Sequence, residues 1–236
     1  DEIGMSYNNR GERSKAFDYF KQALPLRSEA DPVGLANTLS NLGMAHAWIG
    51  DNAKALPYME QAVALLRGKG ELQKESTILS NICVAQRDLG QYKKALEACE
   101  QSLKTKREIG AKNGEATVLN NMANIVAGLG DYQKALDFYN QALPIHKLSG
   151  DRQGEGVVLN NIAWANAEFG EYEKAIEIYH QALQPMREIG YKYGIAMILS
   201  NIGVNYAHLK EYRKALEMHL EVLRLRPEKD DREGRG

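Results

Sequence analysis

The sequence predicts an all-α fold, a solenoid built from stacked helical hairpins. The first observation behind this prediction is a repeat with a period of forty residues, which aligns three columns of identical residues. The columns are Asn41, Asn81, Asn121, Asn161 and Asn201; Ala55, Ala95, Ala135, Ala175 and Ala215; and Gly70, Gly110, Gly150 and Gly190. The second observation is that the apolar residues in each half of a repeat follow helical spacing. A fixed period of about 20 to 50 residues is typical of solenoid proteins.

The period divides the chain into units. We expect complete repeats at 31–70, 71–110, 111–150, 151–190 and 191–227. Residues 1–30 match only the second half of a repeat, so they should form a truncated hairpin. The charged residues 228–236 should form a disordered tail. Because the chain starts inside a repeat and lacks an initiator Met, we expect it to be a segment of a longer protein.

The repeat at 111–150 shows how each hairpin should form. Its two halves carry apolar residues on one helical stripe each, namely Leu119, Met122, Ala123 and Val126, then Ala135, Leu136, Tyr139, Ala142 and Leu143. Between them, Gly130 suits the left-handed position that ends a helix, and Asp131 can cap the next helix. Small residues opposite the alanine column should let the paired helices approach closely; they are Gly43, Cys83, Ala123, Ala163 and Gly203.

The composition argues against two classes of partner. Thirty basic residues against thirty-one acidic ones give a net charge of -1, without the basic excess that nucleic acid or an anionic membrane surface requires. No apolar run approaches the roughly 18 residues of a membrane span, and residues 1–11 lack the features of a signal peptide. We therefore expect a cytoplasmic protein that binds neither nucleic acid nor membranes.

The residues within the repeats resemble the tetratricopeptide repeat (TPR) family. The family signatures appear as Ile202, Gly203 and Tyr206 in a first helix, Gly170, Glu171 and Tyr172 at the turn, and Ala175, Tyr179, Ala182 and the closing Pro227. The forty-residue form looks like the repeats of GoLoco-type polarity scaffolds, kinesin light chains, bacterial Rap-type regulators and the TPR arrays fused to caspase-like CHAT proteases. The resemblance implies a right-handed α-solenoid whose first helices line a concave groove.

The asparagine column is the main candidate for function. On a helical wheel Asn161 lies opposite the stripe that faces the partner helix, so it should not belong to the core of its own hairpin. The resemblance implies that this column lies along the groove and holds the backbone of a bound peptide, because an amide offers both donors and an acceptor. The predicted peptide-binding residues are Asn41, Asn81, Asn121, Asn124, Asn161 and Asn201, with the apolar Val157, Trp164, Met197 and Val204.

Two structural alternatives stay open at this point. Each asparagine could instead bond to a neighbouring repeat, and the column would then be an internal ladder that fixes the register of the repeats. Trp164 could likewise pack between adjacent first helices instead of marking an exposed apolar patch.

Other residues give little sign of chemistry. Cys83 and Cys99 face each other across one hairpin and could oxidise, but we expect small hydrophobic residues in a reducing compartment. The histidines, His46, His146, His180, His208 and His219, lack the paired spacing of metal ligands. Phosphate-binding glycine motifs and nucleophile motifs are absent from the sequence. We therefore expect no enzyme, no metal and no cofactor.

The sequence thus predicts a protein-interaction scaffold that binds a peptide or partner segment in its groove. The alternative is a regulatory or sensor segment of a larger signalling protein or CHAT-type protease, which binds its effector domain in cis. A third hypothesis is an oligomerisation spacer, although we expect a monomer more than an oligomer.

Overall fold

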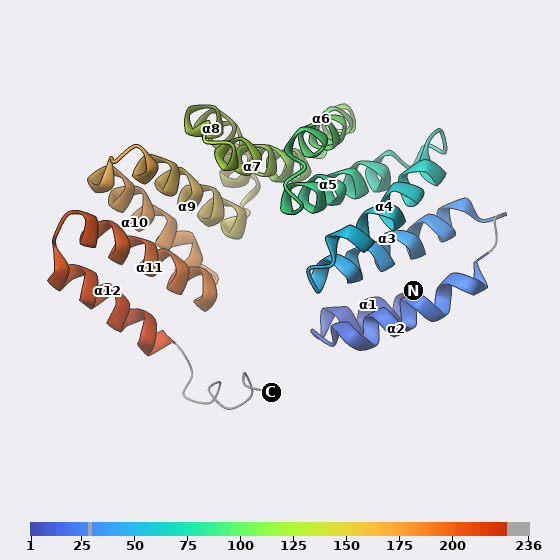
Figure 1. Ribbon diagram of the computed structural model, residues 1–236, viewed down its shortest axis with the longest axis horizontal. Helices are drawn as coiled ribbons and strands as arrows, with labels where there is room; N and C mark the ends of the chain where they lie inside the picture. Colours follow the sequence, from blue (N-terminus) through green and yellow to red (C-terminus); the bar gives the residue numbers. More distant parts are fainter. Residues whose placement is uncertain (28–29, 226–236) are drawn as a thin grey trace. The chain divides into compact units, whose positions relative to one another are not determined.

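The computed structural model describes residues 1–27 and 30–225, and the predicted tail at 228–236 and Pro227 lie outside the described residues. The described residues form twelve α-helices and one 3-10 turn (Figure 1). Their bounds are α1 Glu2–Asn9, α2 Arg13–Ala23, η1 Leu24–Leu26, α3 Pro32–Trp48, α4 Asn52–Leu66, α5 Leu72–Asp88, α6 Tyr92–Glu108, α7 Lys112–Gly128, α8 Tyr132–Ser149, α9 Arg152–Glu168, α10 Tyr172–Glu188, α11 Lys192–His208 and α12 Tyr212–Leu225. The all-α fold class is therefore confirmed.

Short turns separate the helices where glycine follows the first helix of a hairpin. Gly130 adopts a φ of 85°, a left-handed conformation that costs other residues energy. The next residue, Asp131, accepts a hydrogen bond from the Lys134 backbone N–H at 3.1 Å and so caps α8. The turn predicted from these two residues is thus confirmed in its local geometry.

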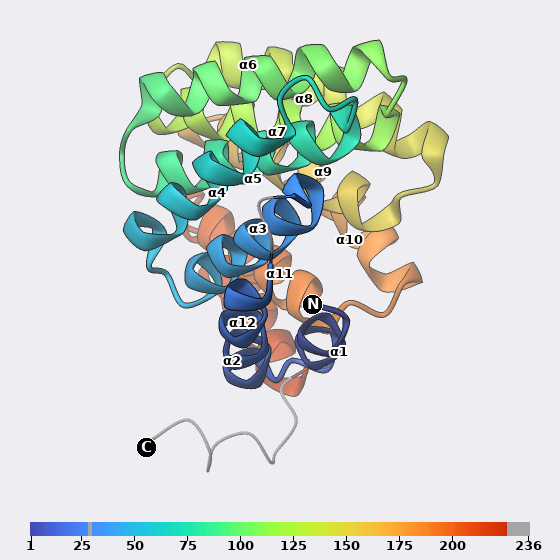
Figure 2. The same cartoon turned by 90° about the vertical axis from the view of Figure 1, so that its right-hand side faces the viewer.

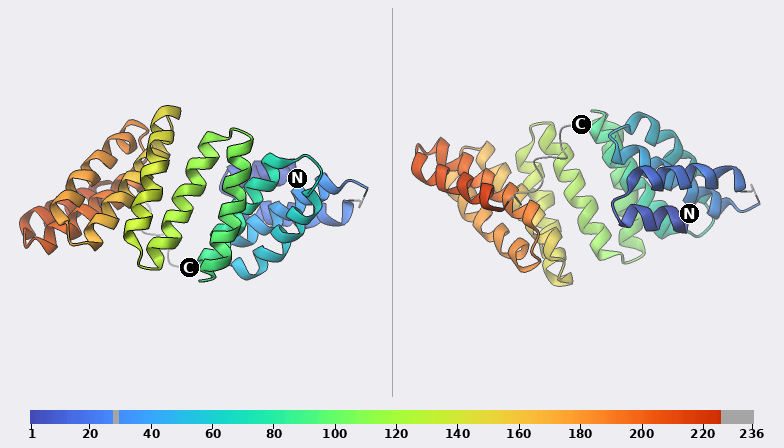
Figure 3. Two further views of the ribbon diagram at one scale, coloured as in Figure 1. Left: turned by 90° about the horizontal axis from the view of Figure 1, so that it is seen from above. Right: turned by 90° about the horizontal axis from the view of Figure 1, so that it is seen from below.

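The helices fall into two compact units, residues 1–125 and the described residues from 126 onward, which divide within α7. In the N-terminal unit, α3 packs against α2 and α4, and α5 packs against both α4 and α6 (Figure 2). In the C-terminal unit, α9 to α12 are successive antiparallel neighbours (Figure 3). First helices also contact each other, α3 with α5 and α9 with α11. Each unit therefore holds a row of neighbouring first helices.

Small residues permit the close crossing of paired helices, as the sequence predicts. A Cβ atom at Gly43 would lie 2.6 Å from Cγ of Met59 and 3.0 Å from the Ala55 carbonyl oxygen. The alanines of the column at positions 55, 95, 135 and 175 are fully buried. A larger side chain at either side of this crossing would have to push the two helices apart.

The cysteine expectation is wrong. Cys83 and Cys99 form a disulfide that joins α5 to α6, with their Cα atoms 5.3 Å apart. The physical reason is the close helix crossing itself, because it holds two facing positions at a separation typical of disulfides. We expected free thiols because a reducing compartment keeps cysteines reduced. That expectation did not take the close helix crossing into account.

The core of the C-terminal unit shows how one helix covers the next. Leu183 on α10 is 1% exposed within a cluster that includes Ile198 and Ile202 of α11. The residue forty positions later, Leu223 on α12, is 60% exposed. The same repeat position is therefore core on α10 and surface on α12.

We predict that Leu183→Ala lowers the free energy of unfolding by about 2 to 5 kcal/mol, because it leaves a cavity in a packed core. Leu223→Ala, the matched control at the same repeat position, should change it by less than about 0.5 kcal/mol. Urea unfolding followed by circular dichroism measures both. Equal losses for the two variants would contradict the assigned burial.

A lysine occupies a core position in the N-terminal unit. Lys106 is only 4% exposed and lies against Gly114, whereas the same repeat position holds the fully buried Leu66 and Met186. Lys106 forms no ion pair with any described residue. Burial disfavours the charged ammonium and so lowers the pKa of Lys106.

We predict that Lys106→Met raises the free energy of unfolding at neutral pH, by about 1 to 3 kcal/mol, because it removes an ammonium group whose charged form burial disfavours. The pKa of Lys106 is lower in the folded chain than in the unfolded one, so the unfolded chain binds the proton more tightly. Parent stability should therefore contain a component that rises with pH toward the ordinary lysine pKa of about 10.4, and the variant should lack it. Thermal unfolding across this pH range measures the effect, with the exposed Lys104→Met as control. A Lys106→Met variant no more stable than this control would refute the prediction.

Candidate functional site

Within each of the two units, the predicted peptide-binding residues lie along one side of the first helices, and we call this side the first-helix face of the unit. Its asparagine column, Asn41, Asn81, Asn121, Asn161 and Asn201, comes from α3, α5, α7, α9 and α11 in turn. Every member of the column is half-buried, and so is Asn124 on α7. The amides are thus neither core residues nor fully solvated. Each unit carries a hollow beside this face.

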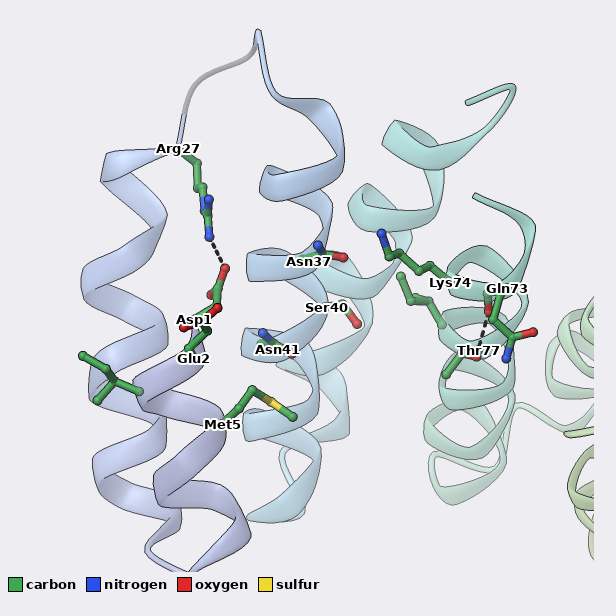
Figure 4. Close-up of a pocket in the computed structure, with 12 residues that line it drawn as sticks. Asp1, Glu2, Met5, Arg27, Asn37, Ser40, Asn41, Gln73, Lys74 and Thr77 are labelled. Carbon is green, nitrogen blue, oxygen red and sulfur yellow. Dashed lines mark hydrogen bonds and ion pairs between the residues drawn. The ribbon is translucent and has the colours of Figure 1, made fainter. Parts of the chain in front are cut away.

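The hollow in the N-terminal unit lies among α1, α3 and α5 and has a volume of about 850 Å³ (Figure 4). Asn37 and Asn41 line it from α3, and Gln73 and Thr77 line it from α5. Met5 adds an apolar contribution from α1. The first-helix face is therefore open to a ligand at the predicted Asn41.

The charges around this hollow are largely compensated. Arg27 pairs with the Asp1 carboxylate, which also accepts a hydrogen bond from the Thr38 hydroxyl at 2.8 Å. Lys74 pairs with Glu71 at 2.9 Å. Within the described part of the chain, the side-chain amides of Asn37 and Asn41 have no hydrogen-bond partner. Both amides are therefore available to a ligand in the hollow.

The second hollow, which we call the aromatic pocket, lies among α9, α10 and α11 and has a volume of about 360 Å³. Side chains from all three helices line it, chiefly Trp164, Glu168, Tyr172, Val204, Asn205 and His208. Trp164 and Val204 remain 36% and 48% exposed, which is unusual for large apolar side chains that sit close together. Asn201 also lines this pocket.

Aromatic contacts fix the walls of the pocket. The Tyr172 ring stacks on His208 with centroids 4.6 Å apart, and Trp164 meets the edge of Tyr132 at 5.6 Å. The Tyr132 hydroxyl donates to the Glu168 carboxylate at 3.3 Å. Burial and the Glu168 charge both raise the pKa of Tyr132. The same two causes, burial first, raise the pKa of Tyr179 beneath the pocket.

The structure brings together some of the predicted apolar residues and separates others. Trp164, Val204 and Asn201 share the aromatic pocket. Met197 is 36% exposed on α11 but does not line the pocket, and Val157 is partly buried against the core of the C-terminal unit. The apolar part of the predicted site is thus narrower than the sequence indicates.

Hydrogen bonds divide the asparagine column. The Asn201 amide donates to the Asn160 side-chain oxygen at 3.0 Å, and the Asn160 amide donates to Asn161 at 3.3 Å. The first of these bonds links α11 to α9, as in an internal ladder, and the second lies within α9. At Asn41 and Asn81, by contrast, the side chains have no hydrogen-bond partner among the described residues. The two hypotheses for the column therefore fit different parts of it.

Asn205 lines the aromatic pocket but is not among the residues predicted from the sequence. Its side chain is 4% exposed, and its Nδ2 donates to the Asn201 backbone oxygen at 2.8 Å. Its Oδ1 is buried without a hydrogen-bond partner. A signal was present, because the same repeat position holds Ala45, Ala85, Ile125 and Ala165 in the other repeats. An amide in an apolar column should have been singled out.

Comparison with known proteins assigns the family. A tetratricopeptide repeat model matches residues 1–68, 74–148, 115–188 and 155–228. This chain belongs to the tetratricopeptide repeat family. Over 62 residues the TPR chain is 44% identical to photosystem I assembly protein Ycf3 from Rippkaea orientalis, a match that covers 26% of this chain. It spans about a third (35%) of the length of that curated relative.

Solved structures share the TPR fold. A signal transduction ATPase with numerous domains (STAND) from Pyrococcus horikoshii, which has a TPR sensor, matches with a TM-score of 0.80 and 20% identity over 94% of this chain and 35% of that one. A Rap protein complexed with competence and sporulation factor matches with a TM-score of 0.69 and 15% identity over 94% and 72%. The predicted likeness to Rap-type regulators is thus confirmed for the fold.

Two features are absent from the described residues of the TPR chain. Among the described residues, no group of three or more His, Cys, Asp or Glu side chains could hold a metal ion. None of the helices in residues 1–27 and 30–225 combines the length and the apolar character that a membrane crossing needs.

We predict that Asn201→Ala lowers the free energy of unfolding by about 1 to 3 kcal/mol, because it leaves the buried Asn160 oxygen without its donor. The matched control is Asn81→Ala in the same column, which should cost less than about 0.5 kcal/mol. Chemical denaturation measures both variants. If they unfold at the same urea concentration, the Asn201 bond contributes no stability.

Proposed function

We propose that this TPR chain is a protein-interaction module that binds a peptide segment of a partner protein on its first-helix face. The observation that carries the proposal is the coincidence, on this face, of hollows, unpaired amides and exposed apolar side chains. In the N-terminal unit, Asn37 and Asn41 line a hollow of about 850 Å³ with no hydrogen-bond partner among the described residues. In the C-terminal unit, Trp164 and Val204 are exposed beside a second hollow.

The chemistry of these groups suits a peptide. A side-chain amide can donate to one backbone carbonyl and accept from one backbone N–H, so it can hold a peptide unit whatever side chain follows. Exposed apolar groups in a hollow can bury a side chain of the ligand and so supply affinity. The Rap protein of similar fold, crystallised with competence and sporulation factor, supports a ligand-binding role for such an array.

A sensor role within a longer polypeptide is the second candidate function. The observation that favours it is the match to the STAND protein, whose TPR array is described as a sensor and whose chain is much longer than this one. In that case the bound segment would belong to the same polypeptide. The first-helix face would still be the binding surface.

We predict that Asn37→Ala combined with Asn41→Ala weakens peptide binding about tenfold, because each lost hydrogen bond contributes roughly 0.5 to 1.5 kcal/mol. The ligand for this test is a peptide selected from a random library displayed on phage, and calorimetry measures its affinity. Both amides lack internal partners among the described residues, so the melting temperature should stay within a few degrees of the parent.

The matched control is Gln61→Ala, which removes an exposed amide from the second helix α4. This control should bind the selected peptide as the parent does. The proposal is wrong if the selected peptide binds the double variant with parental affinity while hydrogen exchange places its footprint on second helices.

A further inference from the structure

Two side-chain amides of the aromatic pocket donate inside the protein. Asn201 Nδ2 donates to the Asn160 side chain, and Asn205 Nδ2 donates to the Asn201 backbone oxygen. The second bond also fixes the orientation of the Asn205 amide, since a carbonyl oxygen can only face its N–H₂ side. One of the two N–H groups of each amide is therefore engaged inside the protein, and Oδ1 is the acceptor of the Asn205 side chain.

The pocket also offers acceptors to a ligand. Asn205 lines the pocket and is only 4% exposed. Its Oδ1 is buried and has no hydrogen-bond partner among the described residues. An unpaired buried acceptor costs free energy that a ligand donor would restore. Glu168 adds a carboxylate to the lining, and among the described residues it accepts a hydrogen bond from the Tyr132 hydroxyl. No described Lys, Arg or His pairs with Glu168.

The walls of the pocket add aromatic faces. Trp164 lies one helical turn before Glu168, so the indole and the carboxylate share one side of α9. The Tyr172 ring, held by its stack on His208, forms part of the lining from α10. Indole and phenol rings attract a cation through the negative charge of their faces. Acceptors, an unpaired carboxylate and aromatic faces thus surround one hollow of about 360 Å³.

We propose that the aromatic pocket binds a basic side chain, lysine or arginine, of the partner segment. This inference rests on the proposed function, because the basic side chain would belong to the bound peptide segment. It adds to that function the class of side chain that the pocket selects. An acidic side chain would be repelled by the Glu168 charge, and no described Lys or Arg lines the pocket to offset that repulsion. An apolar side chain would cover Glu168 and leave Asn205 Oδ1 unpaired, which costs free energy.

A single amino acid tests the pocket without a peptide. The probe is Nα-acetylarginine methylamide, and its neutral counterpart is Nα-acetylcitrulline methylamide, which keeps similar shape and N–H donors. The signal of the Trp164 indole N–H in ¹H–¹⁵N NMR spectra reports binding, and Trp48→Phe assigns it because the chain has only two tryptophans. The arginine probe should give a saturable shift with at least fivefold higher affinity than the citrulline probe.

Two variants test the assigned groups. Glu168→Gln should weaken binding of the arginine probe about tenfold, the usual effect of losing one charge-assisted hydrogen bond. Its matched control, Glu173→Gln, removes the same charge from an exposed position on α10 outside the pocket and should leave the affinity unchanged. Asn205→Ala should also weaken binding without lowering the melting temperature, because alanine already occupies this position at Ala45, Ala85 and Ala165.

The outcomes separate this inference from the proposed function. Equal affinity of the two probes, or equal effects of Glu168→Gln and Glu173→Gln, would overturn the basic-side-chain pocket. If the arginine probe behaves as expected while library peptides leave the first-helix face unprotected, the pocket stands and the peptide-binding proposal fails. If library peptides bind this face but the probe does not shift Trp164, only the pocket assignment is wrong.

Discussion

The close crossing of the two helices in each hairpin is the constraint on which the rest of the structure depends. It requires small residues on both sides, and the contact between Gly43 and the Ala55 backbone shows how little space remains. Because the helices approach so closely, their apolar stripes mesh and each hairpin presents a second stripe to the next one. The same closeness brings Cys83 and Cys99 within bonding distance, and the two residues form a disulfide between α5 and α6.

Because this crossing repeats, a residue that differs in type from the rest of its column can be interpreted by comparison with the other members of that column. Where successive hairpins cover one another, residues of one column meet similar surroundings, so a polar residue in an apolar column marks a position where burial costs free energy. His146 is 4% exposed in the column of Leu66 and Met186, and its Nδ1 lies 2.9 Å from an Asp151 carboxylate oxygen. Lys106 in that column has no such partner, and neither has the Asn205 oxygen in its own column. Buried polar groups without partners reduce stability, so each of them calls for a physical explanation.

The first-helix face combines two uses of one residue type. Near α9 and α11, asparagine amides bond to each other and hold neighbouring repeats in register. Near α3, the amides of Asn37 and Asn41 remain without partners among the described residues and border a hollow. The acceptor for Asn201 comes from the preceding repeat, where Asn160 lies beside the column. The matching position for Asn81 is Ser40, and Asn81 has no side-chain hydrogen-bond partner among the described residues.

Sequence alone determined the helices, the turns and the pairing of small residues, because these follow from spacing within about forty residues. The glycine and aspartate at 130 and 131, the buried alanine column and the half-buried asparagine column all lie where the periodic pattern predicts. The pattern could not show which amides bond to each other, because that depends on distances between helices of different repeats. It could not place Asn205 in the aromatic pocket, nor choose between free thiols and a disulfide. Only the tertiary structure decided these points, since a hydrogen bond or a disulfide depends on ångström separations that residue spacing does not encode.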